Sequence, residues 1–244
     1  DLSNLSTHEI LEKKTNIINY KNFDKQFKNK NILVTGGAGS IGSQLVRQLL
    51  NTNCKNIVGY DNSEIDLFNL KNELNSFSRV KLFLGDILDD KLLEYIVKKE
   101  KINIIFHAAA YKHVTILQNN VQSAIRNNIF GTHKVLNVAK NCNIPIVTIS
   151  TDKAVRPTSI LGLTKRISEV MCLQYNNKFF SSKVVRFGNV FNSVGSAVPT
   201  FINQINNRLP ITITDKNVKR FFMTANEACF LLMTSLKVSK PNNV

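Results

Sequence analysis

The sequence lacks any hydrophobic run that approaches the ~20 residues needed to cross a bilayer. Its polar N-terminus contains no apolar core of a signal peptide. These absences exclude a membrane-spanning helix within the 244 residues of the chain. Because the chain begins at Asp1 rather than at methionine, we expect a fragment, with any membrane attachment in a region before its first residue.

Closely spaced cysteines are also missing. The four cysteines, Cys54, Cys142, Cys172 and Cys229, lie far apart and form no Cys-x-x-Cys pair. This spacing argues against a metal site or a disulfide framework. It predicts buried free thiols in a reducing compartment, and we therefore expect a cytoplasmic protein that holds no metal.

Acidic residues are scarce: 17 Asp and Glu face 32 Lys and Arg, and the formal net charge is +15. Such a charge can indicate nucleic acid or an anionic membrane surface as a partner. The lysines are scattered among asparagines, however, without the interleaved aromatic residues of a base-stacking surface. We therefore predict no nucleic-acid partner and interpret the charge as a Lys/Asn-rich composition bias. An anionic substrate or a nearby acidic leaflet would also suit it.

Strand and helix patterns alternate from residue 31 onward. Strands are predicted at 31–35, 55–60, 80–84, 102–107, 145–150 and 183–187, and helices at 40–51, 64–75, 89–99, 117–141 and 160–177. Several strands are continuous apolar runs, which is typical of strands buried on both faces of a parallel sheet. The pattern predicts an α/β fold with a doubly wound parallel sheet of the Rossmann type. Later segments predict a smaller cap, with helices at 199–207 and 225–237 and a short strand at 211–214.

A glycine run directly follows the first predicted strand. Gly36, Gly39 and Gly42 are spaced G-x-x-G-x-x-G and lead through Ser40 and Ile41 into a helix. Glycines allow a tight turn and a close approach to a pyrophosphate, and the helix N-terminus attracts anions. Asp61 closes the second strand, where a ribose-binding carboxylate belongs, and no arginine nearby would accept a 2′-phosphate. We therefore predict NAD as the cofactor; the alternative is an ordinary glycine-rich turn with a helix-capping aspartate.

Polar and small residues follow three further strands. They are Gly85-Asp86-Ile87 after the third strand, His107-Ala108-Ala109-Ala110 after the fourth, and Ser150-Thr151-Asp152-Lys153 after the fifth. Alanines let a flat ring approach the backbone, although close packing of a helix on the sheet also explains them. Asp86 can accept from an adenine amine. In an open α/β sheet, a ligand binds at these carboxyl ends of the strands.

The motifs together resemble a known family. The glycine run, Asp61 and Gly85-Asp-Ile87 are followed in order by His107-Ala-Ala-Ala-Tyr-Lys-His-Val114, Asn127-Asn-Ile-Phe-Gly-Thr132, Ser150-Thr-Asp-Lys-Ala154, Arg186-Phe-Gly-Asn-Val190 and Arg220-Phe-Phe-Met-Thr224. This order resembles the extended short-chain dehydrogenase/reductases, and within them the polysaccharide-biosynthesis UDP-N-acetylglucosamine 4,6-dehydratases. The resemblance implies a lead-in at 1–30, an NAD-binding Rossmann domain at 31–187 and part of a sugar-binding cap at 188–244. It also implies a homo-oligomer and a family sequence that continues beyond Val244.

One position departs from the wider superfamily. Most short-chain dehydrogenase/reductases carry Tyr-x-x-x-Lys, but here Leu161 precedes Lys165 at that spacing. Membrane-linked dehydratases often have methionine there, so an apolar residue is not foreign to the branch. The chain's one Tyr-x-x-x-Lys, at Tyr95 and Lys99, falls on an earlier helix, and we interpret that match as chance.

The resemblance implies roles for the residues of the Thr-Asp-Lys segment. Asp152 would be the acid for the leaving C6 hydroxyl, Lys153 the base at C5, Thr151 a hydrogen-bond partner of the C4 oxygen, and Lys165 a ligand of the nicotinamide ribose. The acid and base roles require a raised pKa for Asp152 and a lowered pKa for Lys153. The two side chains can also form a simple ion pair. Removal of the C4 hydroxyl proton is left to Thr151, Asp152 or water.

Four residues are candidates for binding the nucleotide sugar. By resemblance, Asn189 would contact the sugar and Arg220 the diphosphate or uracil, although a surface arginine is the alternative. Tyr111 and His113 follow the fourth strand and could line the sugar pocket; His113 could equally be a packed structural residue. The resulting hypothesis is a UDP-N-acetylhexosamine 4,6-dehydratase for surface polysaccharide or glycan synthesis. A UDP-sugar 4-epimerase and a nucleotide-sugar or NAD-binding module without turnover are the alternatives.

Overall fold

The computed structural model describes residues 19–191, 197–213, 215 and 217–237. Six parallel strands form its sheet: β1 (Asn31–Thr35), β2 (Asn56–Asp61), β3 (Val80–Leu84), β4 (Ile104–His107), β5 (Ile146–Thr151) and β6 (Ser182–Phe187). Their order is β3-β2-β1-β4-β5-β6. The chain adds β2 and β3 on one side of β1 and then β4, β5 and β6 on the other, which is the doubly wound arrangement. In such sheets a ligand binds at the point where the order changes side. The predicted fold class is confirmed.

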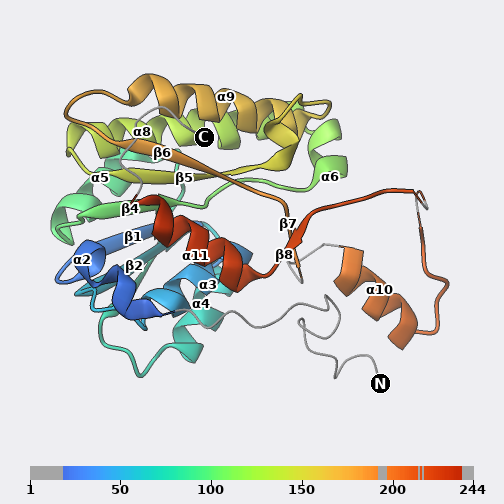
Figure 1. Ribbon diagram of the computed structural model, residues 1–244, viewed down its shortest axis with the longest axis horizontal. Coiled ribbons are helices and arrows are strands. Elements are labelled where there is room, and N and C mark those ends of the chain that lie inside the picture. Colours follow the sequence, from blue (N-terminus) through green and yellow to red (C-terminus); the bar gives the residue numbers. More distant parts are fainter. Residues whose placement is uncertain (1–18, 192–196, 214, 216, 238–244) are drawn as a thin grey trace.

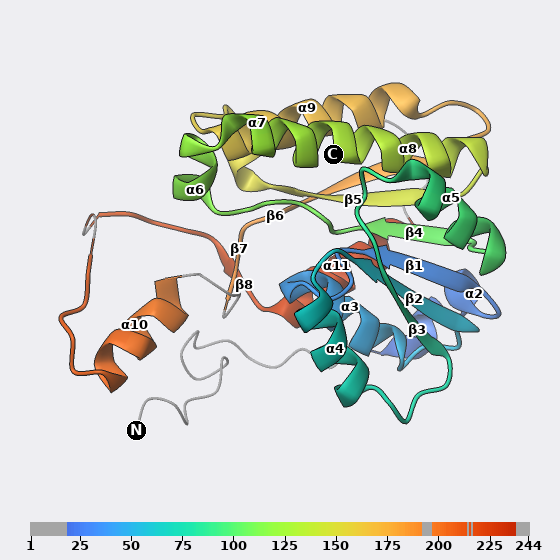
Figure 2. The ribbon, with the colours of Figure 1, turned by 180° about the vertical axis from the view of Figure 1, so that it is seen from behind.

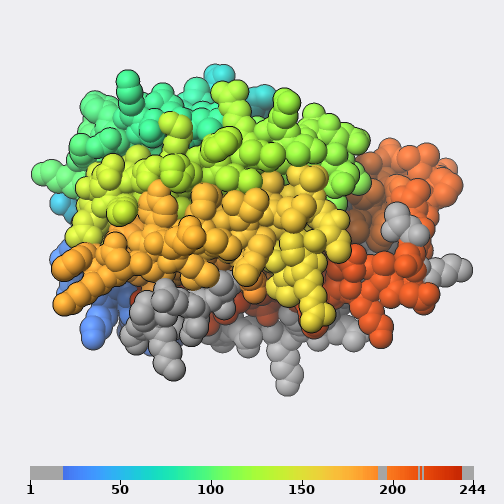
Figure 3. Space-filling model, turned by 90° about the horizontal axis from the view of Figure 1, so that it is seen from above, coloured from blue at the N-terminus to red at the C-terminus, as the bar shows by residue number. Residues whose placement is uncertain are grey.

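Helices cover both faces of the sheet (Figures 1 and 2). On one face lie α2 (Asp24–Phe27), α3 (Ser40–Leu49), α4 (Glu64–Glu73) and α11 (Ala225–Ser235). On the other lie α5 (Asp90–Lys99), α8 (Thr132–Asn141) and α9 (Ile160–Tyr175). From above, α8 and α9 run side by side across the molecule (Figure 3). In the described residues no helix is both long and apolar enough to span a bilayer.

The strands contribute side chains to two separate cores, because neighbouring residues in a strand point to opposite faces. Ile32 and Val34 pack on the side of α3 and α11, whereas Leu33 packs on the side of α5 and α8. All three side chains are completely buried. This explains why the strands read as continuous apolar runs in the sequence.

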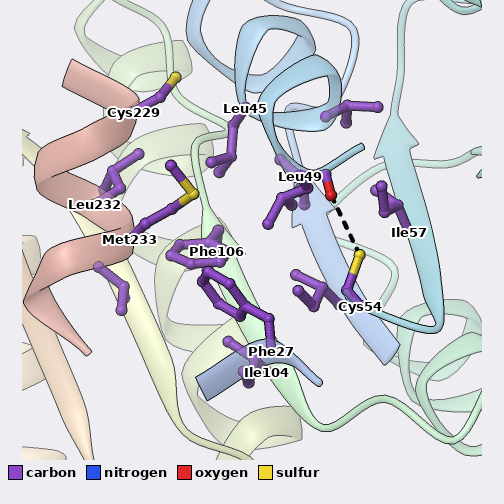
Figure 4. Packing of buried hydrophobic residues seen from close by; sticks show 14 of the residues in the cluster. Phe27, Leu45, Leu49, Cys54, Ile57, Ile104, Phe106, Cys229, Leu232 and Met233 are labelled. Carbon is purple, nitrogen blue, oxygen red and sulfur yellow. Dashed lines mark hydrogen bonds between the residues drawn. The ribbon is translucent and has the colours of Figure 1, made fainter. Parts of the chain in front are cut away.

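Two short elements precede the sheet and belong to the first core. They are a 3₁₀ turn at Tyr20–Phe23 and α2 at Asp24–Phe27, in a segment that the sequence analysis describes only as a lead-in. Phe23 and Phe27 are buried, and the Phe27 ring lies 6.3 Å from that of Phe106 on β4. Figure 4 shows Phe27 beside Phe106, with Met233 and Leu232 of α11 approaching from the other side. Residues 20–27 therefore cover part of the first core.

The helix predicted at 117–141 is interrupted, and this part of the prediction is wrong. The chain forms α6 (Val114–Asn119), α7 (Val121–Ala124), a π-helical segment (Ile125–Gly131) and then α8. Asn120 leaves the helical region at φ −131° and ψ 55°, which ends α6. The π turn then widens the helix where Asn127 and Asn128 are buried. Such turns occur frequently at functional sites.

The later part of the chain contains two further strands and α10. β7 (Asn189–Val190) pairs in parallel with β8 (Phe222–Met223), and α10 (Ala197–Asn206) stands apart from the layers (Figure 1). The short strand predicted at 211–214 is not found at 211–213, where no neighbouring strand offers a partner; Thr214 lies outside the described residues. α11 confirms the helix predicted at 225–237 but packs on the sheet itself. The division at residue 188 between cofactor and sugar regions remains a prediction.

One asparagine links three strands at the amino-terminal edge of the sheet. The Asn31 side-chain amide donates to the carbonyls of Glu100 (2.8 Å) and Lys101 (3.1 Å), just before β4. Its oxygen accepts from the Asn56 amide at the start of β2, 3.0 Å away. Asn31 therefore ties β1 to both neighbouring strands at this edge.

Candidate functional site

The glycine run forms a cradle between β1 and the N-terminus of α3. Gly36 has a φ of 68°, a left-handed conformation that favours glycine, and its N–H donates to the Tyr60 carbonyl at 2.8 Å. A Cβ on Gly42 would lie 1.9 Å from the Gly36 oxygen, so the helix can approach the strand only because this residue is glycine. A Cβ on Gly39 would meet only the Gly36 oxygen, at 3.4 Å, and therefore faces largely open space.

Asp61 lies beside this cradle at the end of β2. Its carboxylate accepts from the backbone N–H groups of Ala38 and Ser63, each at 3.0 Å. One hydrogen bond fixes the carboxylate to the glycine turn and the other to the start of α4. The structure thus brings together Asp61 and the cradle, as the sequence analysis predicts.

The alanines after β4 pass directly over the glycine turn. A Cβ on Gly36 would lie 2.6 Å from the Ala109 nitrogen, and Ala108 N–H donates to the Thr35 carbonyl at 2.9 Å. At the end of β3, Asp86 is exposed, and its carboxylate accepts from Leu88 N–H at 2.9 Å. Ile87, by contrast, is buried against Gly131 of the π turn.

Thr151, Asp152 and Lys153 form a hydrogen-bonded corner where β5 ends. Thr151 Oγ1 donates to Asp152 Oδ1 at 2.9 Å. The Lys153 ammonium donates to the same Asp152 oxygen at 3.0 Å and to Asn189 Oδ1 at 2.9 Å. About a third of each of the two charged side chains is exposed, so the corner is open to a substrate.

Asp152 and Lys153 form an ion pair, which is the alternative to the acid and base roles that the family resemblance implies. Partial burial raises the pKa of the Asp152 carboxyl, but the hydrogen bonds from Lys153 and Thr151 outweigh it and hold that pKa below its ordinary value. A general acid needs the opposite shift. In the protein alone, Asp152 is therefore a carboxylate.

Lys165 lies one turn after Leu161 on α9 and is almost completely buried, with 7% of its surface exposed. Within the part of the chain that the structure describes, its ammonium makes no hydrogen bond or ion pair. Burial lowers the pKa of Lys165 to about 8. A buried cation without an acceptor is unfavourable unless a ligand supplies one.

Leu161 itself is a packing residue in this structure. It is 5% exposed and packs with Leu117 and Ala124. The Tyr95–Lys99 pair lies on the exposed side of α5, where the Lys99 ammonium sits 5.4 Å from the ring centre. This agrees with the interpretation that the second Tyr-x-x-x-Lys spacing is chance.

The four candidate substrate residues are distributed unevenly. Asn189 joins the corner through Lys153. Tyr111 is held by its backbone, whose N–H and carbonyl both bond to the Asn128 amide, and its side chain is exposed. His113 is half-buried before α6. Arg220 is exposed, and its guanidinium donates to the Lys219 carbonyl at 2.8 Å.

Sequence reasoning missed two residues near the site. The Lys112 ammonium reaches Ser40 Oγ, 3.3 Å away at the start of α3, and burial lowers the Lys112 pKa. Asn128, in the π turn, fixes the Tyr111 backbone and donates to Thr164 Oγ1 on α9 at 3.2 Å. Both residues belong to quoted motifs, but only the folded chain shows what they touch.

His107, at the end of β4, is buried between two threonines. Its Nδ1 lies 2.7 Å from Thr35 Oγ1 and its Nε2 lies 3.0 Å from Thr132 Oγ1. Because Thr132 already donates to the Asn128 carbonyl, it accepts from His107, which assigns the proton to Nε2. Burial, with the nearby Lys165 charge, lowers the pKa of His107 to about 3, so the ring is neutral.

Among the described residues, no three or more His, Cys, Asp or Glu side chains gather where they could hold a metal ion.

Strand order and the glycine cradle together define a Rossmann-type dinucleotide-binding fold. The sequence profile described as "Polysaccharide biosynthesis protein" matches residues 32–244. The chain therefore belongs to the polysaccharide biosynthesis protein family.

Several curated proteins are similar to this chain. An uncharacterized membrane protein of Methanocaldococcus jannaschii is 38% identical over 92% of the chain and 68% of its own length. The capsular polysaccharide biosynthesis protein CapD of Staphylococcus aureus is 38% identical over 86% of the chain and 36% of its own length. An inverting UDP-N-acetylglucosamine 4,6-dehydratase of Campylobacter jejuni is 34% identical over 86% of the chain and 64% of its own length. The chain thus spans between about a third and two thirds of these relatives.

Epimerases and solved structures are similar as well. A UDP-glucose 4-epimerase of Rickettsia rickettsii is 32% identical over 85% of the chain and 62% of its own length. The X-ray structure of Pen from Bacillus thuringiensis has a TM-score of 0.82 at 34% identity and covers 88% of this chain and 69% of that one. The NAD complex of dTDP-glucose 4,6-dehydratase from Bacillus anthracis has a TM-score of 0.76 at 21% identity, over 87% of this chain and 73% of that one. The latter similarity shows the fold alone.

Proposed function

We propose that this chain carries the active site of an NAD-dependent UDP-N-acetylhexosamine 4,6-dehydratase that serves surface polysaccharide biosynthesis. The observation that carries the proposal is the Asp152–Lys153 pair, open at the carboxyl ends of the strands and linked to Thr151 and Asn189. The family and the 34% identity to a UDP-N-acetylglucosamine 4,6-dehydratase support this reading.

The residues present fit NAD. The Gly36–Gly42 cradle would receive the pyrophosphate with help from Ser40, Ile41 and the Lys112 ammonium. Asp61 would accept from the adenine ribose, Asp86 from the adenine amine, and Ile87 and Ala108–Ala110 would line the cofactor. The unpartnered Lys165 ammonium would find its acceptors in the nicotinamide ribose. When bound, NAD supplies reversible hydride transfer to and from the sugar.

Dehydration needs four proton transfers, which this chain's residues must mediate. The sugar loses a hydride and the hydroxyl proton at C4, and the resulting ketone acidifies the C5 proton. Lys153 takes the C5 proton while Asp152 protonates the C6 hydroxyl, which leaves as water. As the hydride returns to C6, Lys153 gives its proton back to C5. The proton lost from the C4 hydroxyl, carried by Thr151 or water, replaces the one that Asp152 gave to the leaving group, so the net change is the loss of one water. Thr151 would hydrogen-bond the C4 oxygen.

The resting ion pair is compatible with this chemistry only after one internal proton transfer. Lys153 Nζ and Asp152 Oδ1 share a 3.0 Å hydrogen bond. Movement of that proton from nitrogen to oxygen creates an amine base and a carboxylic acid without changing the net charge. Exclusion of water by a bound sugar would favour this neutral pair, because desolvation disfavours both charged forms.

The remaining parts of the proposal concern the surroundings of the site. Asn189, Tyr111 and His113 would line the sugar pocket, and Arg220 would meet the diphosphate through a forked guanidinium. The four free cysteines suit a reducing compartment, so we place the reaction in the cytoplasm or at the cytoplasmic face of the membrane. We also propose a homo-oligomer.

A UDP-sugar 4-epimerase is the second candidate, supported by the similarity to a UDP-glucose 4-epimerase. An epimerase returns the hydride to C4 and has no leaving group to protonate. The adjacent acid and base of Asp152 and Lys153 therefore favour dehydration.

Incubation of the purified protein with NAD and UDP-N-acetylglucosamine tests the proposal. We expect a product lighter by one water in mass spectrometry, and Asp152→Asn should abolish it while NAD binding persists. A product of unchanged mass but altered C4 configuration would support the epimerase. Binding of both ligands without conversion would support a module without turnover. Full turnover by Asp152→Asn would remove Asp152 from the mechanism.

A further inference from the structure

Lys153 is held from two sides. An ammonium has three donors, and two of those on Lys153 are used, one by Asp152 Oδ1 at 3.0 Å and one by Asn189 Oδ1 at 2.9 Å. The Asp152 oxygen also accepts from Thr151, so it is shared between two donors. Asn189 lies on β7, whereas Lys153 follows β5. Among the described residues, Lys153 is the only hydrogen-bond partner of the Asn189 side-chain oxygen. The third direction of the ammonium is left for a substrate.

Asn189 is itself fixed by backbone contacts. Its N–H donates to the Phe221 carbonyl at 2.8 Å, and it pairs with Phe222 in the β7–β8 ladder. The preceding Gly188 allows this approach, because a Cβ there would lie 2.6 Å from the Phe221 oxygen. A side chain on a fixed backbone can hold its hydrogen-bond partner in one place, and a catalytic group must be held in this way.

We propose that Asn189 is a positioning residue for Lys153: its amide oxygen anchors the Lys153 nitrogen so that the third direction of that nitrogen faces the reacting sugar carbon. After the proton has moved to Asp152, rotation about the Cε–Nζ bond brings the amine lone pair into this third direction. The catalytic consequence rests on the proposed dehydratase function, whereas the anchoring itself does not. The amide is neutral, so it fixes the direction of Lys153 without adding the charge that a second carboxylate would bring. This role differs from the substrate contact that the family resemblance implies.

The anchoring is tested on the protein without substrate. Lys153 is labelled by reductive methylation with formaldehyde and a borohydride reagent, and the rate is read by peptide mass spectrometry. Asn189→Leu removes the acceptor, so we expect Lys153 to react about ten-fold faster, as the loss of a hydrogen bond to a charged group implies. Asn189→Asp keeps an acceptor oxygen and should react no faster than the native protein. Lys99, exposed on α5, is the internal reference.

Controls separate anchoring from a general loosening. Asn137→Ala removes an amide on α8 that accepts from Tyr175, away from Lys153, and should leave Lys153 labelling unchanged. If Asn189→Leu lowers the melting temperature, the rate of Lys153 labelling is compared between Asn189→Ala, which also removes the acceptor, and the native protein. Equal labelling of Lys153 in the native, Asn189→Leu and Asn189→Ala proteins would overturn the proposal.

Steady-state kinetics provide a second test of the role of Asn189. With UDP-N-acetylglucosamine, Asn189→Leu should keep KM near the native value and lower kcat by about ten- to a hundred-fold. The 4-keto sugar that has not lost water should accumulate and be trapped by borodeuteride, because C4 oxidation does not use Lys153. A raised KM without that ketone would assign Asn189 to substrate contact and overturn the catalytic part. If the native protein is inactive, the proposed function fails while the labelling result still decides the anchoring.

Discussion

Lys165 shows what a single residue reveals only in the folded chain. The sequence places it four residues after Leu161 and so marks it as a candidate, but a solvated helix lysine would show the same spacing. Its burial and the missing acceptor depend on how α9 packs over β5, which the spacing does not encode. The same holds for Asp152, whose ion pair depends on the rotamer of Lys153.

The buried charge predicts a measurable effect of Lys165→Met. Folding lowers the pKa of Lys165 from 10.5 to about 8, so between these pH values the unfolded chain binds more protons. The unfolding free energy of the native protein should therefore rise with pH across this window and stay level below it. At pH ~7, Lys165→Met should be more stable without cofactor, by up to about 3 kcal/mol.

Urea unfolding of the cofactor-free protein at several pH values checks this prediction. Lys165→Met should show a smaller rise in this window, because only Lys112 and Lys183, whose pKa values burial also lowers, still contribute to it. Calorimetry should show weaker NAD binding. Lys99→Met, at an exposed position, is the control and should change neither quantity. A variant less stable than the native protein at neutral pH would contradict the prediction.

At the scale of elements, the sequence predicts regular pieces well and their irregularities poorly. Strands such as β1 and β5 are identified because both faces are buried and the runs are apolar. The π turn was missed because an extra residue in a helix scarcely disturbs its periodicity over a few turns. The Ile-Thr alternation at 211–213 has a strand composition, yet pairing needs a neighbouring strand that the sequence cannot supply.

The packing of α3 on β1 distinguishes two of the three glycines. Gly42→Ala places a methyl group 1.9 Å from the Gly36 oxygen, so helix or strand must move. We expect a loss of about 2 kcal/mol of stability, in the range of overpacked cores, together with loss of NAD binding. Gly39→Ala meets only one atom, at 3.4 Å, and should fold normally.

Thermal melting and NAD titration of both variants test this distinction. Weakened NAD binding in a normally stable Gly39→Ala would show that the open space at Gly39 belongs to the ligand. Equal stability of Gly42→Ala and the native protein would mean that the close approach of α3 is not needed.

At the scale of the whole molecule, the order of layers follows from the sequence but the outer limits of the domain do not. Phe23 and Phe27 lie in the stretch that the family resemblance marks as a lead-in, yet both are buried under the sheet. α11 lies within the segment expected to form the cap, yet its Leu232 and Met233 join the same core. In both cases the burial of particular apolar side chains, and not the position of the segment in the chain, decides the packing.

Phe27→Ala tests whether the segment before β1 is part of the folded body. Removal of this fully buried ring should cost about 3–5 kcal/mol of unfolding free energy in urea. Phe68→Ala, on α4 where 62% of the side chain is exposed, should cost less than about 1 kcal/mol. Similar losses for the two variants would show that residues 20–27 contribute nothing to the core.

The asparagine at the start of β1 has a consequence for how such proteins diverge. Asn31 aligns three strands at one edge of the sheet, while the segments that bear Asp152, Lys112 and Asn189 all follow strands at the opposite edge. We therefore expect strand alignment and substrate preference to be under separate control. If the proposed site is correct, changes in those segments alone would alter the sugar that is accepted while the strand alignment stays the same.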